Sequence, residues 1–249
     1  MNSRAQLYAR IAVWAGTIVA LAALVTAIAA GAGYDSGLWD IHAGFRILQW
    51  SVYIAAGSGV AAFAGLVVAL LDRHYRAALI GAVGLAVALA LVLPSWQLQE
   101  RAQMLPSIHD ITTDTDNPPQ FVALRAVREQ SPNGPAYGGE KIAQQQKAGY
   151  PDIQPLVLDD PPARAFERAL AAARNMGWEI AAASPEDGRI EATATTRWFR
   201  FKDDVVIRVP PSATGSRIDV RSKSRLGRSD LGTNAKRIRA YFAALNSVS

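Results

Sequence analysis

The chain has 249 residues and a net charge of +5. It contains no cysteine, which excludes disulfides, thiolate metal sites and cysteine nucleophiles. Half of the residues are hydrophobic, but charged residues are rare up to Ser95 and frequent after it. This division predicts a membrane domain over residues 1–96 and a soluble domain over residues 97–249, and about 150 residues are enough for one domain with its own core.

Three stretches without charged residues fill most of the first part: residues 11–32, 47–71 and 77–96. A helix needs roughly 20 apolar residues to cross the hydrocarbon core of a bilayer, so each stretch predicts one transmembrane helix. A cleaved signal peptide is the alternative for the first stretch, but its apolar run is longer than the usual 7–15 or so residues. We expect it to remain as a membrane helix.

The distribution of arginine predicts the orientation. Arg4 and Arg10 precede the first helix, and Arg73 and Arg76 lie in the short loop between the second and third. If both regions face the cytoplasm, the third helix carries the soluble domain to the outside. In a bacterial inner membrane the C-terminal domain is then periplasmic.

Small residues recur at four-residue spacing in the second stretch, at Gly57, Ala61 and Gly65. This spacing lets two helices approach closely. It fits packing within the chain, and homo-oligomerisation through the same residues is the alternative. Ionisable residues are absent from the middle of all three stretches, so transport by these helices alone is not expected.

Residues 97–160 form an irregular lead-in, rich in proline, glycine and polar residues, that we expect to wrap around the following core. Two short helices are predicted in it. The first follows Pro118 and Pro119, and the second covers residues 140–148 and ends before Gly149.

The compact core is predicted to begin with a helix capped by Asp160 and ended by Gly177. Four strands follow, at residues 178–182, 189–201, 205–209 and 217–224, with Asp203 and Asp204 expected in a turn. A last helix carries an apolar stripe over residues 231–245. The expected fold class is three transmembrane α-helices followed by an α+β domain, with a four-stranded antiparallel sheet covered by two helices on one face.

The densest polar constellation joins the last strand to the last helix. Backbone N–H groups at a helix N-terminus attract anions, and nearby arginines add charge-assisted donors. The alternative is structural: the arginines pair with aspartates, and Asp230 or Ser229 caps the helix. The candidate anion-binding residues are Arg221, Ser222, Arg225, Arg228, Ser229, Asp230 and Asn234.

Other chemistry has weaker support. His109 and Asp110, with Asp114 and Asp116, offer ligands for a hard cation, but the run lacks the glycine and final glutamate of a calcium loop. A nucleophile elbow is also absent from the sequence. We therefore expect no metal site, no cofactor and no nucleic-acid partner, and we assign no catalytic residue.

Residues 108–114, 150–153 and 219–238 resemble the domain-of-unknown-function 1499 (DUF1499) family. The resemblance extends over residues 106–245. The family includes envelope-associated bacterial proteins, some with membrane helices, and the resemblance carries over no reaction and no catalytic residue. It implies one local unit, structural or binding, made of Arg221, Ser222, Arg225, Ser229, Asp230 and Asn234.

These observations predict an integral membrane protein whose extracytoplasmic domain binds an anionic envelope ligand or scaffolds an envelope assembly. Besides the lipid bilayer, the expected partners are an envelope protein or an anionic lipid or polysaccharide. One alternative is an envelope enzyme acting on lipid or cell-wall carbohydrate. Another is a purely structural partner of a membrane complex.

Overall fold

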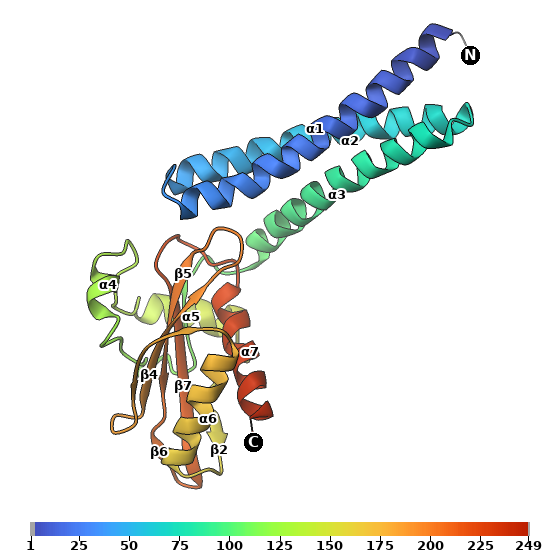
Figure 1. Ribbon diagram of the computed structural model, residues 1–249. Helices are drawn as coiled ribbons and strands as arrows, with labels where there is room; N and C mark the ends of the chain where they lie inside the picture. Colours follow the sequence, from blue (N-terminus) through green and yellow to red (C-terminus); the bar gives the residue numbers. More distant parts are fainter. Residues whose placement is uncertain (1–2, 249) are drawn as a thin grey trace. The chain divides into compact units, whose positions relative to one another are not determined.

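The computed structural model describes residues 3–248. It divides the chain into two compact units, which are described separately (Figure 1). The first consists of Met1–Glu100 together with Trp198–Arg200, and the second of Arg101–Arg197 and Phe201–Ser249.

Three long helices make up nearly all of the first unit: α1 (Ser3–Asp35), α2 (Ile41–Leu71) and α3 (Tyr75–Met104). All three are long and apolar enough to cross a membrane. Each extends beyond its predicted stretch because polar residues continue the helix past the apolar run. At the start of α2, the Asp40 carboxylate accepts a hydrogen bond from the backbone N–H of Ala43.

Glycines allow the three helices to pack closely. A Cβ atom at Gly16 would lie 3.0 Å from the backbone nitrogen of Ala62, and one at Gly84 would lie 2.9 Å from the Cα atom of Thr17. The Thr17 hydroxyl donates to the carbonyl of Ile80 across the α1–α3 contact. Small residues thus bring all three helices into contact, as is common in membrane bundles.

The predicted stripe of small residues on α2 is divided between two environments. Gly65 is buried and Ala61 is half-buried, whereas Gly57 is exposed. A Cβ atom added to Gly57 would meet no atom within 4 Å. Of the three positions, Gly57 is therefore the most open to a neighbouring helix.

A seven-stranded antiparallel sheet organises the second unit, with the order β1-β7-β5-β4-β3 and with β2 and β6 also paired to β7. Its strands are β1 (Asp110–Thr112), β2 (Leu156–Leu158), β3 (Glu179–Ser184), β4 (Arg189–Thr195), β5 (Lys202–Arg208), β6 (Pro211–Ser212) and β7 (Gly215–Ser224). The four predicted strands correspond to β3, β4, β5 and β7. The predicted number was wrong because β1, β2 and β6 have only two or three residues each, too few to show a periodic pattern.

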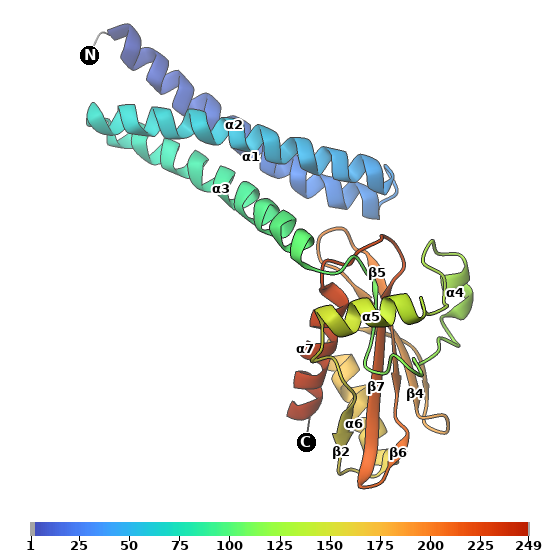
Figure 2. The same ribbon diagram turned by 180° about the vertical axis from the view of Figure 1, so that it is seen from behind.

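Four helices complete this unit: α4 (Arg125–Glu129), α5 (Glu140–Gly149), α6 (Pro162–Asn175) and α7 (Thr233–Ser247). Figures 1 and 2 show α6 and α7 together on one side of the sheet and α4 away from them. The residue before α6 is Pro161, and the prediction that Asp160 caps this helix was wrong. The Asp160 carboxylate instead pairs with the guanidinium groups of Arg164 and Arg168.

The hydrophobic core lies between α6, α7 and one face of the sheet. It takes alternate residues of the strands, such as Ile190, Ile207 and Val220. The rings of Trp178 and Tyr241 stack in it with centroids 5.3 Å apart. This is the predicted arrangement of two helices on one face.

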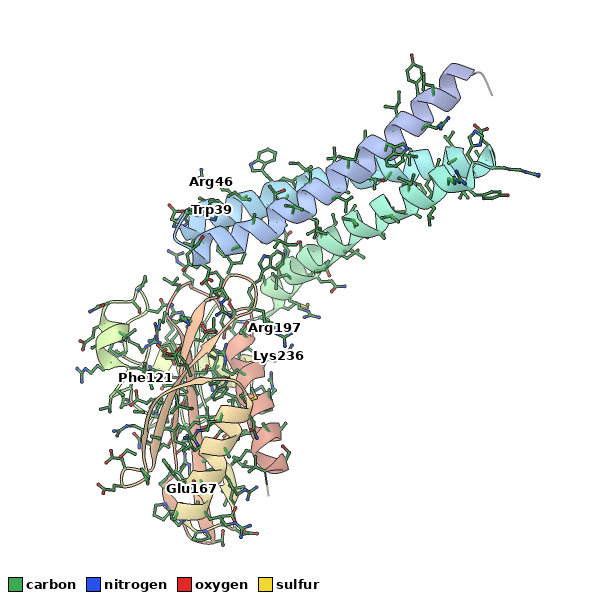
Figure 3. The ribbon with its side chains drawn as sticks, viewed as in Figure 1. Trp39, Arg46, Phe121, Glu167, Arg197 and Lys236 are labelled. Carbon is green, nitrogen blue, oxygen red and sulfur yellow. The ribbon has the colours of Figure 1, made fainter. Side chains whose placement is uncertain are left out.

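The opposite face of the sheet is also buried, although its side chains are largely charged. Asp204 and Arg221 are both 0% exposed. The lead-in covers them, and its residues Phe121 and Leu124 pack against Val206 of β5. Figure 3 labels Phe121 on the side of α4 and Lys236 on α7.

Candidate functional site

The charged face is defined here as the buried polar side chains that β4, β5 and β7 direct toward the lead-in. It consists of Glu191, Thr193, Asp204, Asp219, Arg221 and Lys223. Successive strand residues point to opposite faces of a sheet, so these residues alternate with the apolar residues of the core. Burial of such charges is costly unless each is paired and hydrogen-bonded.

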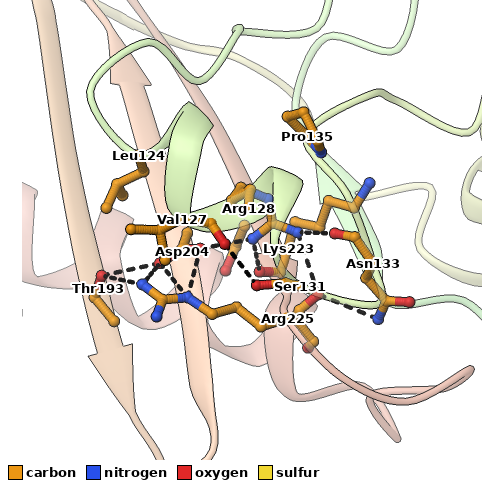
Figure 4. Close-up of polar contacts among 12 residues, drawn as sticks. Leu124, Val127, Arg128, Ser131, Asn133, Pro135, Thr193, Asp204, Lys223 and Arg225 are labelled. Atoms are coloured by element: carbon orange, nitrogen blue, oxygen red, sulfur yellow. Dashed lines mark hydrogen bonds and ion pairs between the residues drawn. The ribbon is translucent and has the colours of Figure 1, made fainter.

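Asp204 is the centre of the first group of contacts on this face (Figure 4). Its carboxylate accepts from Arg128 Nη1 at 2.7 Å, from Arg225 Nη2 at 2.8 Å and from the Thr193 hydroxyl at 2.9 Å. Arg128 comes from α4 and is 0% exposed. Its remaining N–H groups donate to backbone carbonyls, including those of Asn133 and Lys223.

The prediction that Asp203 and Asp204 form a solvated turn was wrong. Both lie within β5 and are buried, on opposite faces of the sheet. The physical reason is that each carboxylate has an arginine partner distant in sequence: Arg237 for Asp203 and Arg128 for Asp204. Ion pairing replaces the hydration that a turn would provide.

Arg221 forms the second group. Its guanidinium donates two hydrogen bonds to the Asp110 carboxylate, at 2.9 and 2.8 Å, and further bonds to the carbonyls of Pro119 and Pro135. The rings of Phe121 and Tyr137 lie 5.0 and 5.4 Å from its central carbon. Burial, followed by the nearby Asp110 charge, raises the pKa of Tyr137 to about 12.

Glu191 connects the sheet to the start of α4. Its carboxylate accepts hydrogen bonds from three consecutive backbone N–H groups, those of Val122, Ala123 and Leu124, at 2.9–3.0 Å. Successive amides of this kind form an anion-binding concavity. Here a carboxylate of the chain itself occupies it.

A separate polar cluster lies on the core side of the sheet, beside α7. The Ser222 hydroxyl donates to Asn234 Oδ1 at 2.7 Å and accepts from Arg237 at 3.0 Å. Asn234 Nδ2 donates in turn to the carbonyl of His109 and to the Ser224 hydroxyl. The Ser222 hydroxyl and both polar atoms of the Asn234 side chain therefore already have hydrogen-bond partners in this bridge between β7 and α7.

Asp230 occupies the N-terminal end of α7. Its carboxylate accepts from the backbone N–H groups of Gly232 and Asn234, at 2.9 and 2.7 Å. Burial raises the pKa of Asp230, and the two N–H groups oppose that shift. The N-cap of α7 is Gly232, so the prediction that Asp230 or Ser229 caps this helix was wrong, but the Asp230 carboxylate still occupies two backbone N–H groups at this end.

The structure does not bring the seven candidate residues to one site. Ser222, Asp230 and Asn234 join at the start of α7, and the Ser229 hydroxyl accepts from the N–H of Leu231 close by. Arg221 and Arg225 belong to the opposite face of the sheet. Arg228 is exposed, and its backbone carbonyl lies 3.2 Å from Nδ1 of His109.

The seven candidate residues do not include Arg128, Glu191 and Lys223, which belong to the same network. The signal for Lys223 was present: charged residues alternate with apolar ones along β7. A strand with one solvated face has the same pattern, so the sequence cannot distinguish a solvated charged face from a buried one. Arg128 and Glu191 lie 63 residues apart, and only the tertiary fold brings them to the same face.

A polar cavity of about 320 Å³ lies beside this network, within the second unit. It is lined by the turn that follows β1, by α5 and the loop after it, and by β7. The lining residues are Thr113, Asp114, Thr115, Asp116, Gln146, Lys147, Tyr150, Ile153, Gln154, Pro155 and Arg217. Within residues 3–248 no group of three acidic or histidine side chains is placed to hold a metal ion.

A family model described as "Protein of unknown function (DUF1499)" matches residues 110–245. None of the curated proteins matches the chain. The matched range begins with β1 and ends in α7, so it contains the whole sheet and its charged face.

Proposed function

The chain belongs to this family of unknown function, and from that premise we propose that it is a membrane-anchored binding module rather than an enzyme. The observation that supports the proposal is the internal pairing of its charges. Asp110, Asp203, Asp204 and Glu191 each have a cationic partner or backbone donors within the domain. These charged residues therefore support a structural role, and we assign binding to exposed surfaces and cavities of the domain.

We place the domain on the extracytoplasmic side, in the periplasm of a bacterial cell. The loop between α2 and α3 carries Arg73, and Arg76 lies in the first turn of α3, whereas the loop between α1 and α2 has neither lysine nor arginine. The bias of basic residues toward the cytoplasm supports this orientation. The partners available there are envelope proteins, lipid headgroups and polysaccharides.

The alternative of an envelope enzyme receives less support from the geometry. Ser222 is 0% exposed and hydrogen-bonded to Asn234 and Arg237, so it is not available as a nucleophile. The alternative of anion binding at the β7–α7 corner now depends chiefly on Arg228, since the Asp230 carboxylate already accepts from two backbone N–H groups at the start of α7. A purely structural partner of a membrane complex would need the same exposed surfaces as a binding module.

Native mass spectrometry of the full chain, extracted with its surrounding lipid, tests the proposal. We expect a bound molecule other than bulk bilayer lipid, present in a fixed ratio to the chain. This companion should remain chemically unchanged on prolonged incubation. A chain that carries bulk lipid alone would contradict binding. Chemical conversion of the companion would show an enzyme instead.

A further inference from the structure

We propose that the polar cavity between the turn after β1 and the α5 loop binds a neutral, hydroxyl-rich ligand of the carbohydrate class. This inference rests on the proposed function, since it names the ligand class of a binding module. Three features of the cavity support it: the internal neutralisation of its charges, its unused hydrogen-bonding groups and its size.

The charges in the cavity wall neutralise one another. Asp114 Oδ2 accepts from Arg208 and Arg217 at 3.0 and 2.8 Å, and its other oxygen accepts from two backbone N–H groups. Lys147 pairs with Asp116 at 3.3 Å. Among the lining residues, the two carboxylates of Asp114 and Asp116 thus face the two cations Lys147 and Arg217, and an ionic ligand would have to displace a partner that is already in place.

Neutral hydrogen-bonding capacity remains. The Thr113 oxygen accepts from the N–H of Val220, so its hydroxyl proton is free to donate. Gln154 Nε2 donates to the carbonyl of Pro151, which leaves its side-chain oxygen free to accept. Arg217 uses Nε and Nη2 on carboxylates, and Nη1 has no partner among residues 3–248. A hydroxyl group, which donates and accepts at once, matches this mixture of donors and acceptors.

The remaining wall and the volume suit a small ring. Tyr150 and Ile153, both buried, add an aromatic and an aliphatic surface to the polar lining. The C–H face of a sugar ring packs on such surfaces while its hydroxyls reach the polar groups. The volume of about 320 Å³ lies at the lower end of the roughly 300–1,000 Å³ range of small-molecule sites.

Saturation-transfer NMR on the full chain in lipid nanodiscs tests this inference. The neutral probes are chitotriose and maltotriose, and inorganic phosphate is the anionic probe. Thr115→Phe fills the cavity, and Gln154→Ala removes an exposed polar group from its wall. Gln144→Ala is the matched control, because Gln144 is exposed on α5, does not belong to the cavity lining and donates to Glu140.

We expect at least one oligosaccharide to bind saturably to the unmodified chain. Thr115→Phe should abolish binding, Gln154→Ala should weaken it by about five- to tenfold, as for one lost hydrogen bond, and Gln144→Ala should leave it unchanged. All variants should keep the melting temperature of the unmodified chain.

Two results would overturn the inference: no transfer to either oligosaccharide at millimolar concentration, or oligosaccharide binding that Thr115→Phe does not affect. Binding of phosphate alone would replace the neutral class with an anionic one. If native mass spectrometry shows a bound companion while any of these results is obtained, the proposal of a binding module stands. Only the carbohydrate class of its ligand is then rejected.

Discussion

At the scale of single residues, the domain uses ion pairs where most domains use apolar packing. Arg128, Arg221 and Asp204 are fully buried, and each makes several hydrogen bonds. A buried pair of this kind contributes little relative to an apolar core, but the loss of one partner leaves an uncompensated charge. The pairs of Arg128 with Asp204 and of Asp110 with Arg221 therefore tie the lead-in to this face of the sheet.

Asp204→Asn should destabilise the domain strongly, because it leaves the buried guanidinium of Arg128 without its carboxylate. We expect a loss of about 3–5 kcal/mol in the free energy of unfolding. Asp152→Asn is the control, since it breaks an ion pair with Arg239 in which both side chains are about half exposed; its cost should be about 0–1 kcal/mol. Urea unfolding of the full chain measures both, and equal losses would contradict a structural role for Asp204.

Asp114 should make stability depend on acid pH. Burial alone would raise the pKa of Asp114, but the N–H groups of Asn117 and Asp116, with Arg217 and Arg208, hold it below the ordinary value of 3.8. A lowered pKa in the folded state means that the ionised carboxylate stabilises the fold at neutral pH, and this contribution is lost as the pH falls through the folded-state value.

Melting temperatures of the unmodified chain and of Asp114→Asn, recorded from pH 7 downward, measure this effect. The difference between the two proteins should shrink in acid as Asp114 becomes protonated. A difference that stays constant down to the lowest pH would exclude the assigned contribution.

At the scale of elements, small residues in the helices have two different roles. Gly84 lets α3 approach the backbone of α1 at Thr17, whereas Gly57 faces open space on α2. The sequence pattern around Gly57 predicts either internal packing or self-association, and the structure uses other positions, including Gly16 and Gly84, for internal packing. Self-association through Gly57 remains a prediction.

Gly84→Leu and Gly57→Leu form a matched pair for these two roles. Gly84→Leu should lower the melting temperature of the chain in detergent, because its Cβ atom would lie 2.9 Å from the Thr17 Cα atom. Gly57→Leu should keep the melting temperature and reduce cross-linking between copies in the membrane. Undiminished cross-linking in Gly57→Leu would reject this helix face as a contact between copies.

At the scale of the whole molecule, the two units differ in hydropathy and charge, and the proposed function assigns anchoring to the first and recognition to the second. Residues 11–32, 47–71 and 77–96 contain no charged side chain, so the helices lack the groups with which membrane proteins move ions or protons. The sheet domain has the charges, the polar cavity and the family match. Function is therefore best sought in residues 101–249.

The proposed orientation predicts the behaviour of a reporter fused after Ser249. With the N-terminus in the cytoplasm and three membrane crossings, alkaline phosphatase, which is active only outside the cytoplasm, should be active there. A cytoplasm-specific fluorescent reporter at the same position should be dark. The reverse result would mean an even number of crossings or an inverted N-terminus.

The sequence by itself determined the three apolar helices, the four longer strands, the two covering helices and the family. The helices and the longer strands show in the sequence because hydropathy and periodicity repeat over six or more residues, and the family shows in local motifs. The number of strands could not be predicted from the sequence, because strands of two or three residues form only through their pairing with β7.

Only the tertiary structure decided what the charged residues do. The alternation of Arg217, Asp219, Arg221 and Lys223 along β7 fits a solvated face and a buried ionic face equally well. The lead-in decides between them, because Asp110 and Arg128 reach that face from distant parts of the chain. Pair formation across some 76 to 111 residues leaves no local trace in a sequence, so the sequence of the β7–α7 corner fits an anion-binding site and a structural unit alike. The cavity beside β7 arises from the same distant packing.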